Sequence, residues 1–345
     1  MKIVVIGPQH PDSLPKCSAE TFRALGNEVL TVDERKVLKV SLDKDLSRGK
    51  MKKWSILKLR LADYAMKIFP NFENKIYNRI ADLSADFQPD LVITHSTWVP
   101  PESLLRLKKN TNAKIVCWFP DHPGNLGRQY LLSGCYDYLF FKDKYLVSMA
   151  KRINQNAAYL PECCEPKWHK RITLSEEELK KYTCDVTIAG NLYYYRAKIF
   201  EELSKYCDVK IWGPPIPRWL KTNLNKFHQN QLVTEEEKAK AFSGAKIVIN
   251  TFQGEVEGIN LRTFEAAGCG AFQICEYREE IEKLFIPGEE IETFRNLDEL
   301  NEKVKFYLAN PEKRKEIADK GYKRAHEDHT YTKRITELLS IIKEL

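Results

Sequence analysis

The sequence has no apolar run that approaches the roughly 20 residues of a transmembrane helix. Its first apolar stretch, KIVVIG, is too short for the hydrophobic core of a signal peptide. The nine cysteines are an odd number and include no C-x2-C pair, so neither a disulfide framework nor a zinc site is predicted. Low-complexity segments and internal repeats are also missing. We therefore expect a cytoplasmic globular protein.

Charge is present in excess of one sign and is unevenly placed. The 345 residues carry a formal net charge of +7, and the stretch from Lys44 to Arg60 holds seven basic residues against one acid. A patch of this kind attracts anionic lipid or an acidic polymer. A solvated helix face is the simpler expectation, and we expect no nucleic-acid partner.

Apolar residues recur at helical spacing between Met51 and Phe69, where Pro70 ends the predicted helix. They are Trp54, Leu57, Leu61, Ala65 and Ile68. Packing of this stripe into the core is the simpler expectation. Because the opposite face is basic, a peripheral contact of residues 44–69 with the inner face of the membrane stays open as an alternative.

The chain begins with two strand patterns, KIVVI and NEVLTVD, separated by a helix, which predicts a Rossmann-like β-α-β unit. The loop GPQHPDSLP between them lacks G-x-G-x-x-G, so a dinucleotide cofactor is disfavoured. Ligands bind at the carboxyl ends of strands in such sheets. Gly7, His10 and, after a later strand, His95 are therefore candidates for the lining of a cleft.

A further strand pattern, KIVCWF, ends in Pro120, Asp121, His122 and Pro123. Asp121 and His122 are the best acid or base candidates in the amino-terminal half, because they follow a strand end. Capping of the next helix is an equally good interpretation of Asp121.

The strand and helix rhythm breaks between Leu160 and Thr173, where prolines and two adjacent cysteines occur. A second βα series begins with DVTIAG, and it ends in Gly190. We therefore expect two domains, residues 1–163 and 164–329.

The most informative stretch runs from Ile247 to Ile274 and predicts a strand, a glycine-containing loop, a short helix and a second strand. Glu257 and Glu265 bracket the turn with seven residues between them. A diphosphate fits the start of the helix, where backbone N–H groups and the helix dipole favour an anion. The residues expected there are Gly258, Ile259, Asn260 and Leu261, with Asn260 as the N-cap residue and Arg262 as a bidentate donor to phosphate.

The E-x7-E pair followed by FEAAGCG resembles the nucleotide-sugar site of GT-B glycosyltransferases, especially glycosyltransferase family 4, and NLRTFEAAGCGAF resembles the CgeB-like branch. The resemblance implies an α/β fold of two Rossmann-like domains facing a cleft, with residues 330–345 as a helix that returns to the amino-terminal domain. It also implies that Glu257 faces the donor sugar and Glu265 the ribose. Arg196, close to Gly190, then corresponds to the family's basic residue for the donor diphosphate.

These observations predict a glycosyltransferase that moves a sugar from a nucleotide-diphosphate donor to an acceptor. We expect it to need no metal and no cofactor, and the E-x7-E pair favours retention of configuration; if the enzyme inverts, Asp121 is the expected base. The donor nucleotide (UDP, GDP or ADP) and the acceptor (a glycan, a lipid-linked glycan or a protein) stay open. A GT-B nucleotide-sugar epimerase and a non-catalytic scaffold that binds sugar nucleotides or polyanions are the alternatives.

Overall fold

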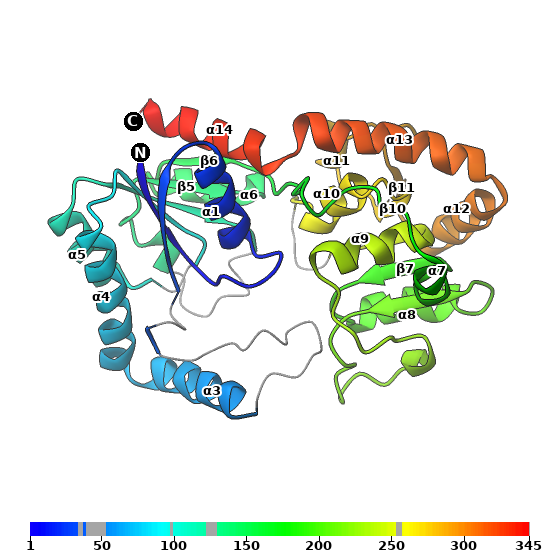
Figure 1. Cartoon of the computed structure of the whole chain (residues 1–345), viewed down its shortest axis with the longest axis horizontal. Coiled ribbons are helices and arrows are strands. Elements are labelled where there is room, and N and C mark those ends of the chain that lie inside the picture. Colours follow the sequence, from blue (N-terminus) through cyan, green and yellow to red (C-terminus); the bar gives the residue numbers. More distant parts are fainter. Residues whose placement is uncertain (34–36, 39–52, 97–98, 122–129, 253–256, 345) are drawn as a thin grey trace.

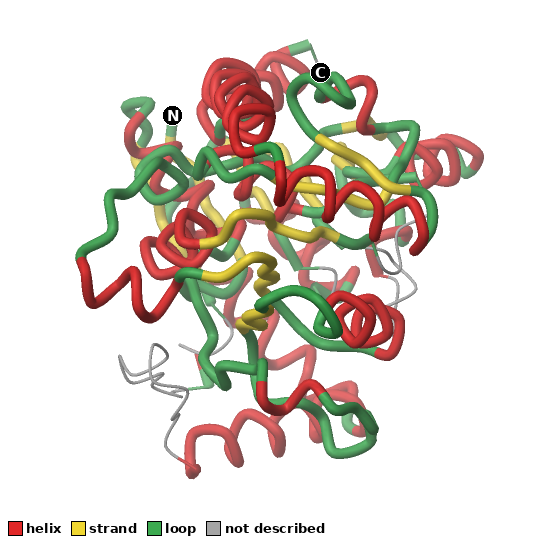
Figure 2. Tube along the Cα trace, turned by 90° about the vertical axis from the view of Figure 1, so that its right-hand side faces the viewer, coloured by secondary structure: helices red, strands yellow, loops and turns green. Residues whose placement is uncertain are grey.

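The computed structural model describes residues 1–33, 37–38, 53–96, 99–121, 130–252 and 257–344. In these residues the chain forms two α/β domains, each built on a parallel sheet (Figure 1). In both domains helices cover the strands, as the view turned by 90° also shows (Figure 2). The predicted fold class, two Rossmann-like domains, is confirmed.

The amino-terminal domain is organised on a six-stranded sheet with the order β2-β1-β3-β4-β5-β6. Its strands are β1 (Lys2–Ile6), β2 (Glu28–Val32), β3 (Leu91–Thr94), β4 (Lys114–Phe119), β5 (Tyr138–Phe141) and β6 (Ala157–Tyr159). Every pair is parallel, so the carboxyl ends of all these strands meet at one edge of the sheet.

Alternate residues of β1 reach the two faces of this sheet, as the period of a strand requires. Ile3 and Val5 pack in a core cluster with residues of α1 and α14, whereas Val4 and Ile6 pack with residues of α4 and α5. The helices of this domain are α1 (Leu14–Ala24), α3 (Lys53–Ile68), α4 (Pro70–Asp86), α5 (Pro101–Asn110), the 3-10 turn η3 (Tyr130–Leu132) and α6 (Lys144–Arg152). The strands, which are rich in β-branched and aliphatic residues, are thus buried on both faces of the sheet.

The carboxyl-terminal domain has a five-stranded parallel sheet with the order β11-β10-β9-β7-β8. Its strands are β7 (Cys184–Ala189), β8 (Val209–Trp212), β9 (Ala245–Asn250), β10 (Gln273–Glu276) and β11 (Glu292–Phe294). Its helices are α7 (Glu176–Tyr182), α8 (Tyr194–Leu203), η4 (Leu224–Lys226), α9 (Glu235–Gly244), α10 (Leu261–Gly268), α11 (Ile281–Leu284), α12 (Leu297–Ala309) and α13 (Pro311–Asp328). Ile247 and Ile249 of β9 pack with α8 and α12, whereas Val248 packs with α9 and α10.

Two segments connect the domains. Along the first, Cys163 lies in the amino-terminal core and Cys164 in a core cluster of the other domain, which supports placing the boundary between these two cysteines. The second is the passage from α13 into α14 (Tyr331–Lys343), which lies over the amino-terminal domain in Figure 1. Because α14 buries Tyr331, Ile335 and Leu338 in the same core cluster as α1, the predicted return of the last helix is confirmed.

Helix α3 differs from its simpler expectation. Leu57, Leu61 and Ile68 are 46%, 58% and 46% exposed, and Tyr64 on the same helix is 64% exposed. The prediction that the apolar stripe packs into the core is therefore wrong for these residues, because helical spacing shows only which side chains share a face and not what covers them. The side chain of Trp54 and residues 44–52 lie outside the described residues.

Candidate functional site

The carboxyl ends of the amino-terminal strands contact the second domain. Asp12, in the loop after β1, accepts hydrogen bonds from the backbone N–H of Glu235 at 2.9 Å. Lys144, which follows β5, forms an ion pair with Glu280 at 3.2 Å. The loops at this edge of the first sheet therefore meet the donor domain predicted from the sequence, and most candidate residues lie in or near this region.

Two arginines converge at the end of β7. A Cβ atom placed on Gly190 would lie 2.5 Å from Nη2 of Arg262 and 3.4 Å from Nη1 of Arg196, and the φ of +135° at Gly190 is itself a conformation that favours glycine. Arg196 is buried, donates from Nε to Thr251 at 3.1 Å, and donates from Nη1 to the carbonyl of Asn191. Arg196 and Arg262, which were predicted to bind the diphosphate, thus meet at Gly190 from the first turns of α8 and α10.

Asn260 is the N-cap residue of α10, as predicted, but its side chain does not cap the helix. Its amide instead pairs reciprocally with that of Asn250 at 3.0 Å and donates to the carbonyl of Thr251 at 3.0 Å. Asn250 also donates to Thr263 at 3.0 Å. This network fixes the start of α10 against the end of β9 and leaves the first turn of the helix without a side-chain cap, which is the arrangement that suits an external anion.

Gly258 has a different role from the predicted one. Its backbone N–H and that of Glu257 both donate to Oδ2 of Asp143, at 3.1 and 3.0 Å, and a Cβ on Gly258 would lie 2.8 Å from the carbonyl oxygen of Lys142. The close approach that requires a glycine here is therefore made by the amino-terminal domain, and the prediction that Gly258 admits a diphosphate is corrected. Ile259 is buried in the core, and Leu261 is half-buried at the start of α10.

The two glutamates of the E-x7-E pair lie in opposite environments. Glu257 is exposed, whereas Glu265 is 3% exposed. Oε1 of Glu265 accepts a hydrogen bond from Nζ of Lys238 at 2.7 Å, and the same ammonium group contacts Oδ2 of Asp12 at 2.6 Å. One lysine of the carboxyl-terminal domain thus joins a carboxylate of each domain.

Charge governs the protonation of this cluster. Burial alone would lower the pKa of Lys238, but the carboxylates of Glu265 and Asp12 outweigh burial and raise that pKa. Burial would raise the pKa of Asp12, but the charge of Lys238 holds that pKa below its usual value. Asp12 and Lys238 are therefore both charged at neutral pH.

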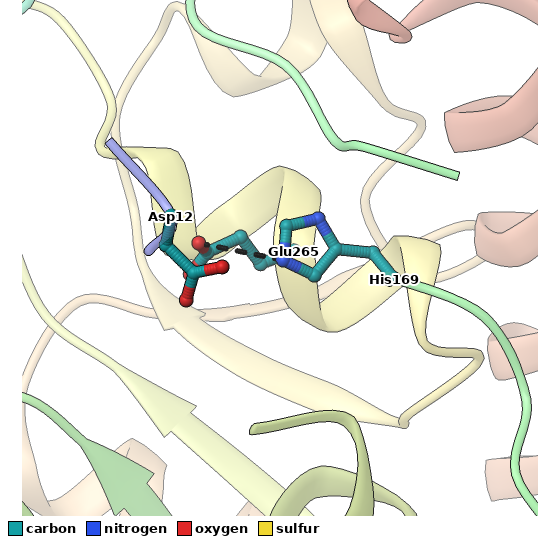
Figure 3. A group of neighbouring side chains, drawn as sticks. All are labelled: Asp12, His169 and Glu265. Carbon is teal, nitrogen blue, oxygen red and sulfur yellow. Dashed lines mark ion pairs between the residues drawn. The ribbon is translucent and has the colours of Figure 1, made fainter. Parts of the chain in front are cut away.

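His169 completes the cluster from the interdomain segment (Figure 3). Its Nδ1 accepts the backbone N–H of Glu165 at 2.9 Å, so in the neutral ring the proton is on Nε2, which lies 3.6 Å from Oε1 of Glu265. Burial lowers the pKa of His169, which favours this neutral form.

Asp12, His169 and Glu265 place one ligand atom each within 4.8 Å of one another, a spacing that fits a metal ion. Two features oppose a metal: the ammonium of Lys238 already supplies the positive charge, and the tautomer of His169 directs a proton, not a lone pair, toward the carboxylate. We therefore interpret the cluster as an ionic contact between the domains.

The three cleft candidates of the amino-terminal domain differ in burial: Gly7 and His95 are buried next to each other, whereas His10 is exposed. A Cβ on Gly7 would lie 3.6 Å from Cβ of His95, so these two residues meet at the ends of β1 and β3. His95 is buried, its Nδ1–H donates to the carbonyl of Trp118 at 3.0 Å, and burial lowers its pKa to about 4. His10 is exposed in its loop.

Asp121 is exposed directly after β4, and His122 lies outside the described residues. Near this strand end the structure adds a buried ion pair that the sequence did not predict, Lys142 and Glu162 at 3.2 Å. Burial raises the pKa of Glu162 to about 7, and the charge of Asp121 contributes to that rise. A carboxyl group that titrates near neutral pH therefore lies at the same edge of the sheet as Asp121.

The contacts that sequence reasoning missed connect residues far apart in the chain. Asp12 and Asp143 follow strands, as Gly7 and Asp121 do, and this position was the one available signal for them. Lys238 is one of two lysines in the helical segment TEEEKAKAFSGA, and nothing in the sequence distinguishes it from the other, Lys240.

Comparison with known proteins shows what this chain is similar to. Residues 196–340 match the family model described as glycosyl transferase-like. The spore protein CgeB of Bacillus subtilis (strain 168) is 22% identical over 255 residues, which are 69% of this chain and 78% of that protein. Both findings agree with the resemblance that the segment from Asn260 to Phe272 carries.

Solved structures with the same fold extend over the whole chain. Sucrose-phosphate synthase from Thermosynechococcus elongatus aligns with a TM-score of 0.69 at 11% identity, covering 100% of this chain and 99% of the other. HepE of Anabaena, in complex with UDP and glucose, aligns with a TM-score of 0.66 at 9% identity, covering all of both chains. A glycosyltransferase from Rickettsia africae aligns with a TM-score of 0.61 at 12% identity, covering 99% and 98%. The two-domain fold is therefore that of the GT-B proteins.

Proposed function

We propose that this chain, which has the GT-B fold and matches the glycosyl transferase-like family model over residues 196–340, is a CgeB-like glycosyltransferase that transfers a sugar from a nucleotide-diphosphate donor to an acceptor. The observation that carries this proposal is the meeting of the Arg196 and Arg262 guanidinium groups at Gly190, beside the uncapped start of α10. Two guanidinium groups and a helix amino terminus form a site for a group with two or more negative charges.

The same groups supply the chemistry that the transfer needs. When the bond between the sugar and the diphosphate breaks, negative charge develops on the leaving phosphate, and Arg196 and Arg262 stabilise that charge most strongly in a site from which water is excluded. Two fixed cations at the diphosphate supply this charge without a metal ion. The UDP bound to HepE supports a nucleoside diphosphate as the ligand, and the base of the donor stays open.

The two glutamates keep their proposed roles in this scheme. Glu257 is exposed before α10 and is proposed to accept hydrogen bonds from the donor sugar. One oxygen of Glu265 accepts a hydrogen bond from Lys238, and we propose that the carboxylate also accepts hydrogen bonds from ribose hydroxyls.

The proposal that the reaction retains the configuration of the sugar rests on the E-x7-E resemblance. In an inverting reaction Asp121 is the proposed base, and the buried Glu162 beside it is the second carboxyl to test.

Ligand-induced stabilisation tests the donor site. A nucleoside diphosphate at 100 times its Kd stabilises the protein by about 2.7 kcal/mol, which raises the melting temperature. Arg262→Met and Glu265→Ala should abolish the rise given by the best of UDP, GDP and ADP. Arg314→Met is the matched control, because Arg314 donates to the carbonyl of Leu308 at 3.2 Å on the outer helices. An unchanged rise in Arg262→Met would refute the assignment of the diphosphate site.

Transfer is separated from its alternatives by the products. With donor and acceptor candidates present, a glycosyltransferase releases the nucleoside diphosphate in proportion to glycosylated acceptor. Incubation without any acceptor should leave the donor sugar unchanged apart from slow hydrolysis. Interconversion of the donor sugar under those conditions would identify an epimerase instead, and binding without release from any donor would identify a scaffold.

We also infer that α3 contacts an anionic membrane surface peripherally. Its exposed apolar residues Leu57, Leu61 and Tyr64 share the helix with the exposed bases Lys58 and Arg60, a combination that fits the boundary between headgroups and acyl chains. No helix in the described part of the chain is long and apolar enough to cross a membrane.

Vesicle sedimentation tests this contact. The protein should sediment with vesicles that contain phosphatidylglycerol and less with pure phosphatidylcholine, and Leu61→Asp should reduce the binding. Leu105→Asp is the control, because Leu105 is 55% exposed on α5. Equal sedimentation of both variants would contradict the inference, as would a Leu61-dependent dimer in the absence of lipid.

A further inference from the structure

The segment between the two glutamates is held from outside its own domain at both ends. At its beginning, the carboxylate of Asp143 accepts the backbone N–H groups of Glu257 and Gly258 through Oδ2, while its Oδ1 accepts the N–H of Tyr145 at 2.9 Å as the N-cap of α6. One side chain of the amino-terminal domain thus orders its own helix and the donor-side loop together. A carboxylate bonded to three N–H groups is a strong, directional contact.

At the other end, Asp12 holds Glu265 indirectly. Its carboxylate accepts the N–H of Glu235, the first residue of α9, with both oxygens at 2.9 Å, and its Oδ2 lies 2.6 Å from Nζ of Lys238, which in turn bonds Glu265. The side chains of Asp12 and Lys238 are 9% and 11% exposed. Because the interior screens charge poorly, Asp12 contributes to the position of Lys238 and so to that of Glu265.

We propose that Asp12 and Asp143 are positioning residues that complete the donor site, because each fixes one end of the segment from Glu257 to Glu265 when the two domains are in contact. This inference rests on the proposed function, since it assigns the segment to donor binding. In this proposal neither aspartate binds the donor itself. Both act through Glu257 and Glu265, the residues proposed to accept hydrogen bonds from the donor sugar and the ribose.

Two consequences distinguish positioning from a merely structural role. Binding of a nucleoside diphosphate and contact between the domains become coupled, so that each strengthens the other by the same factor. Loss of either aspartate should therefore weaken the binding of the ligand and also weaken the contact between the two domains in solution. A residue that only stabilised the fold would lower the melting temperature without either effect.

The experiment uses Asp12→Asn and Asp143→Asn in the full chain, because the amide keeps the volume and removes the charge. Each variant should bind the best nucleoside diphosphate about tenfold or more weakly by calorimetry, the effect of about one charge-assisted hydrogen bond. The KM for the donor should rise by a similar factor, and the radius of gyration from small-angle scattering should increase. Asp82→Asn is the control, because Asp82 pairs with Arg106 at 2.6 Å on the surface of the amino-terminal domain.

Gly258→Ala gives an independent test without any change of charge. Its Cβ would lie 2.8 Å from the carbonyl oxygen of Lys142, so the variant should reproduce both effects of Asp143→Asn. Wild-type affinity and scattering in Asp12→Asn, Asp143→Asn and Gly258→Ala would overturn the inference. If the wild-type protein binds no nucleoside diphosphate, the proposed function fails, and the scattering of the same variants still decides whether the aspartates hold the domains together.

Discussion

Replacing Lys238 by Met tests the ionic contact between the domains most severely. Methionine has a similar length but no charge, so Asp12 and Glu265 lose an ammonium group that lies 2.6 and 2.7 Å from their oxygens. Removing one partner of a buried ion pair costs about 3–5 kcal/mol, because the remaining charge stays buried without compensation. We expect the free energy of unfolding of Lys238→Met at pH 7 to be lower than that of the wild-type protein by this amount.

The pH dependence gives the sign of the effect. In the wild-type protein the pKa of Asp12 is lowered, so its contribution is present at neutral pH and is lost as the pH falls through that pKa. In the variant the carboxylate of Asp12 has lost the charge of Lys238, so burial raises the pKa of Asp12 and the variant regains stability when acid neutralises this group. The difference in unfolding free energy between the two proteins should therefore shrink as the pH falls from 7 to 4.

Urea unfolding of both proteins at several pH values measures this difference. Lys240→Met is the matched control on the same helix. Lys240 also has two acidic partners, Glu178 at 2.9 Å and Glu236 at 2.8 Å, but the side chains of these partners are 29% and 55% exposed, and a solvent-exposed pair contributes about 0–1 kcal/mol. A loss in Lys238→Met no greater than in Lys240→Met, or a difference that does not change with pH, would show that Lys238 does not hold the two buried carboxylates together.

Three further predictions follow from single contacts. The lowered pKa of His95, about 4, means that the unfolded chain binds a proton that the folded chain does not, so the free energy of unfolding should fall by about 2 kcal/mol from pH 7 to pH 5. The variant His95→Asn should lack this loss in unfolding experiments, and an equal loss in the variant would contradict the prediction. Gly190→Ala should cost about 1–3 kcal/mol of strain and weaken nucleoside diphosphate binding in calorimetry, because its Cβ meets Arg262; wild-type affinity would exclude a role for this turn. Leu338→Ala should lower the free energy of unfolding in urea by about 2–5 kcal/mol, and Leu57→Ala by no more than about 0.5 kcal/mol. Similar losses in the two variants would mean either that Leu338 of α14 is not buried in the core or that Leu57 of α3 is.

The parts of the site that depend on local sequence were predicted. Gly190 directly follows a buried strand pattern, and Arg196 and Arg262 lie in the first turns of the helices that come after two such strands. Parallel strands bring their carboxyl ends to one edge of the sheet, so the order of elements places these three residues at the same edge. The N-cap position of Asn260 was predicted from the preference of asparagine for the start of a helix. The side-chain direction of Asn260 was not, because it is set by Asn250, ten residues earlier.

The contacts between domains could not be predicted, because they join residues 223 and 114 positions apart and depend on how two separately folded units meet. Gly258 shows the effect of this limit. A glycine in a loop before a helix indicates a close approach of some kind, and only the structure shows that Lys142 and Asp143 make it. The exposure of the apolar face of α3 could not be predicted for the same reason, because helical periodicity shows which side chains share a face and not which element packs against it.

The most direct test of the central claim is the position of the diphosphate in crystals of the protein soaked with UDP-, GDP- and ADP-sugars. We expect phosphate oxygens bonded to Arg196 and Arg262 at Gly190, at the start of α10, with ribose hydroxyls near Glu265. A diphosphate bound elsewhere, or one that reaches neither arginine, would contradict it.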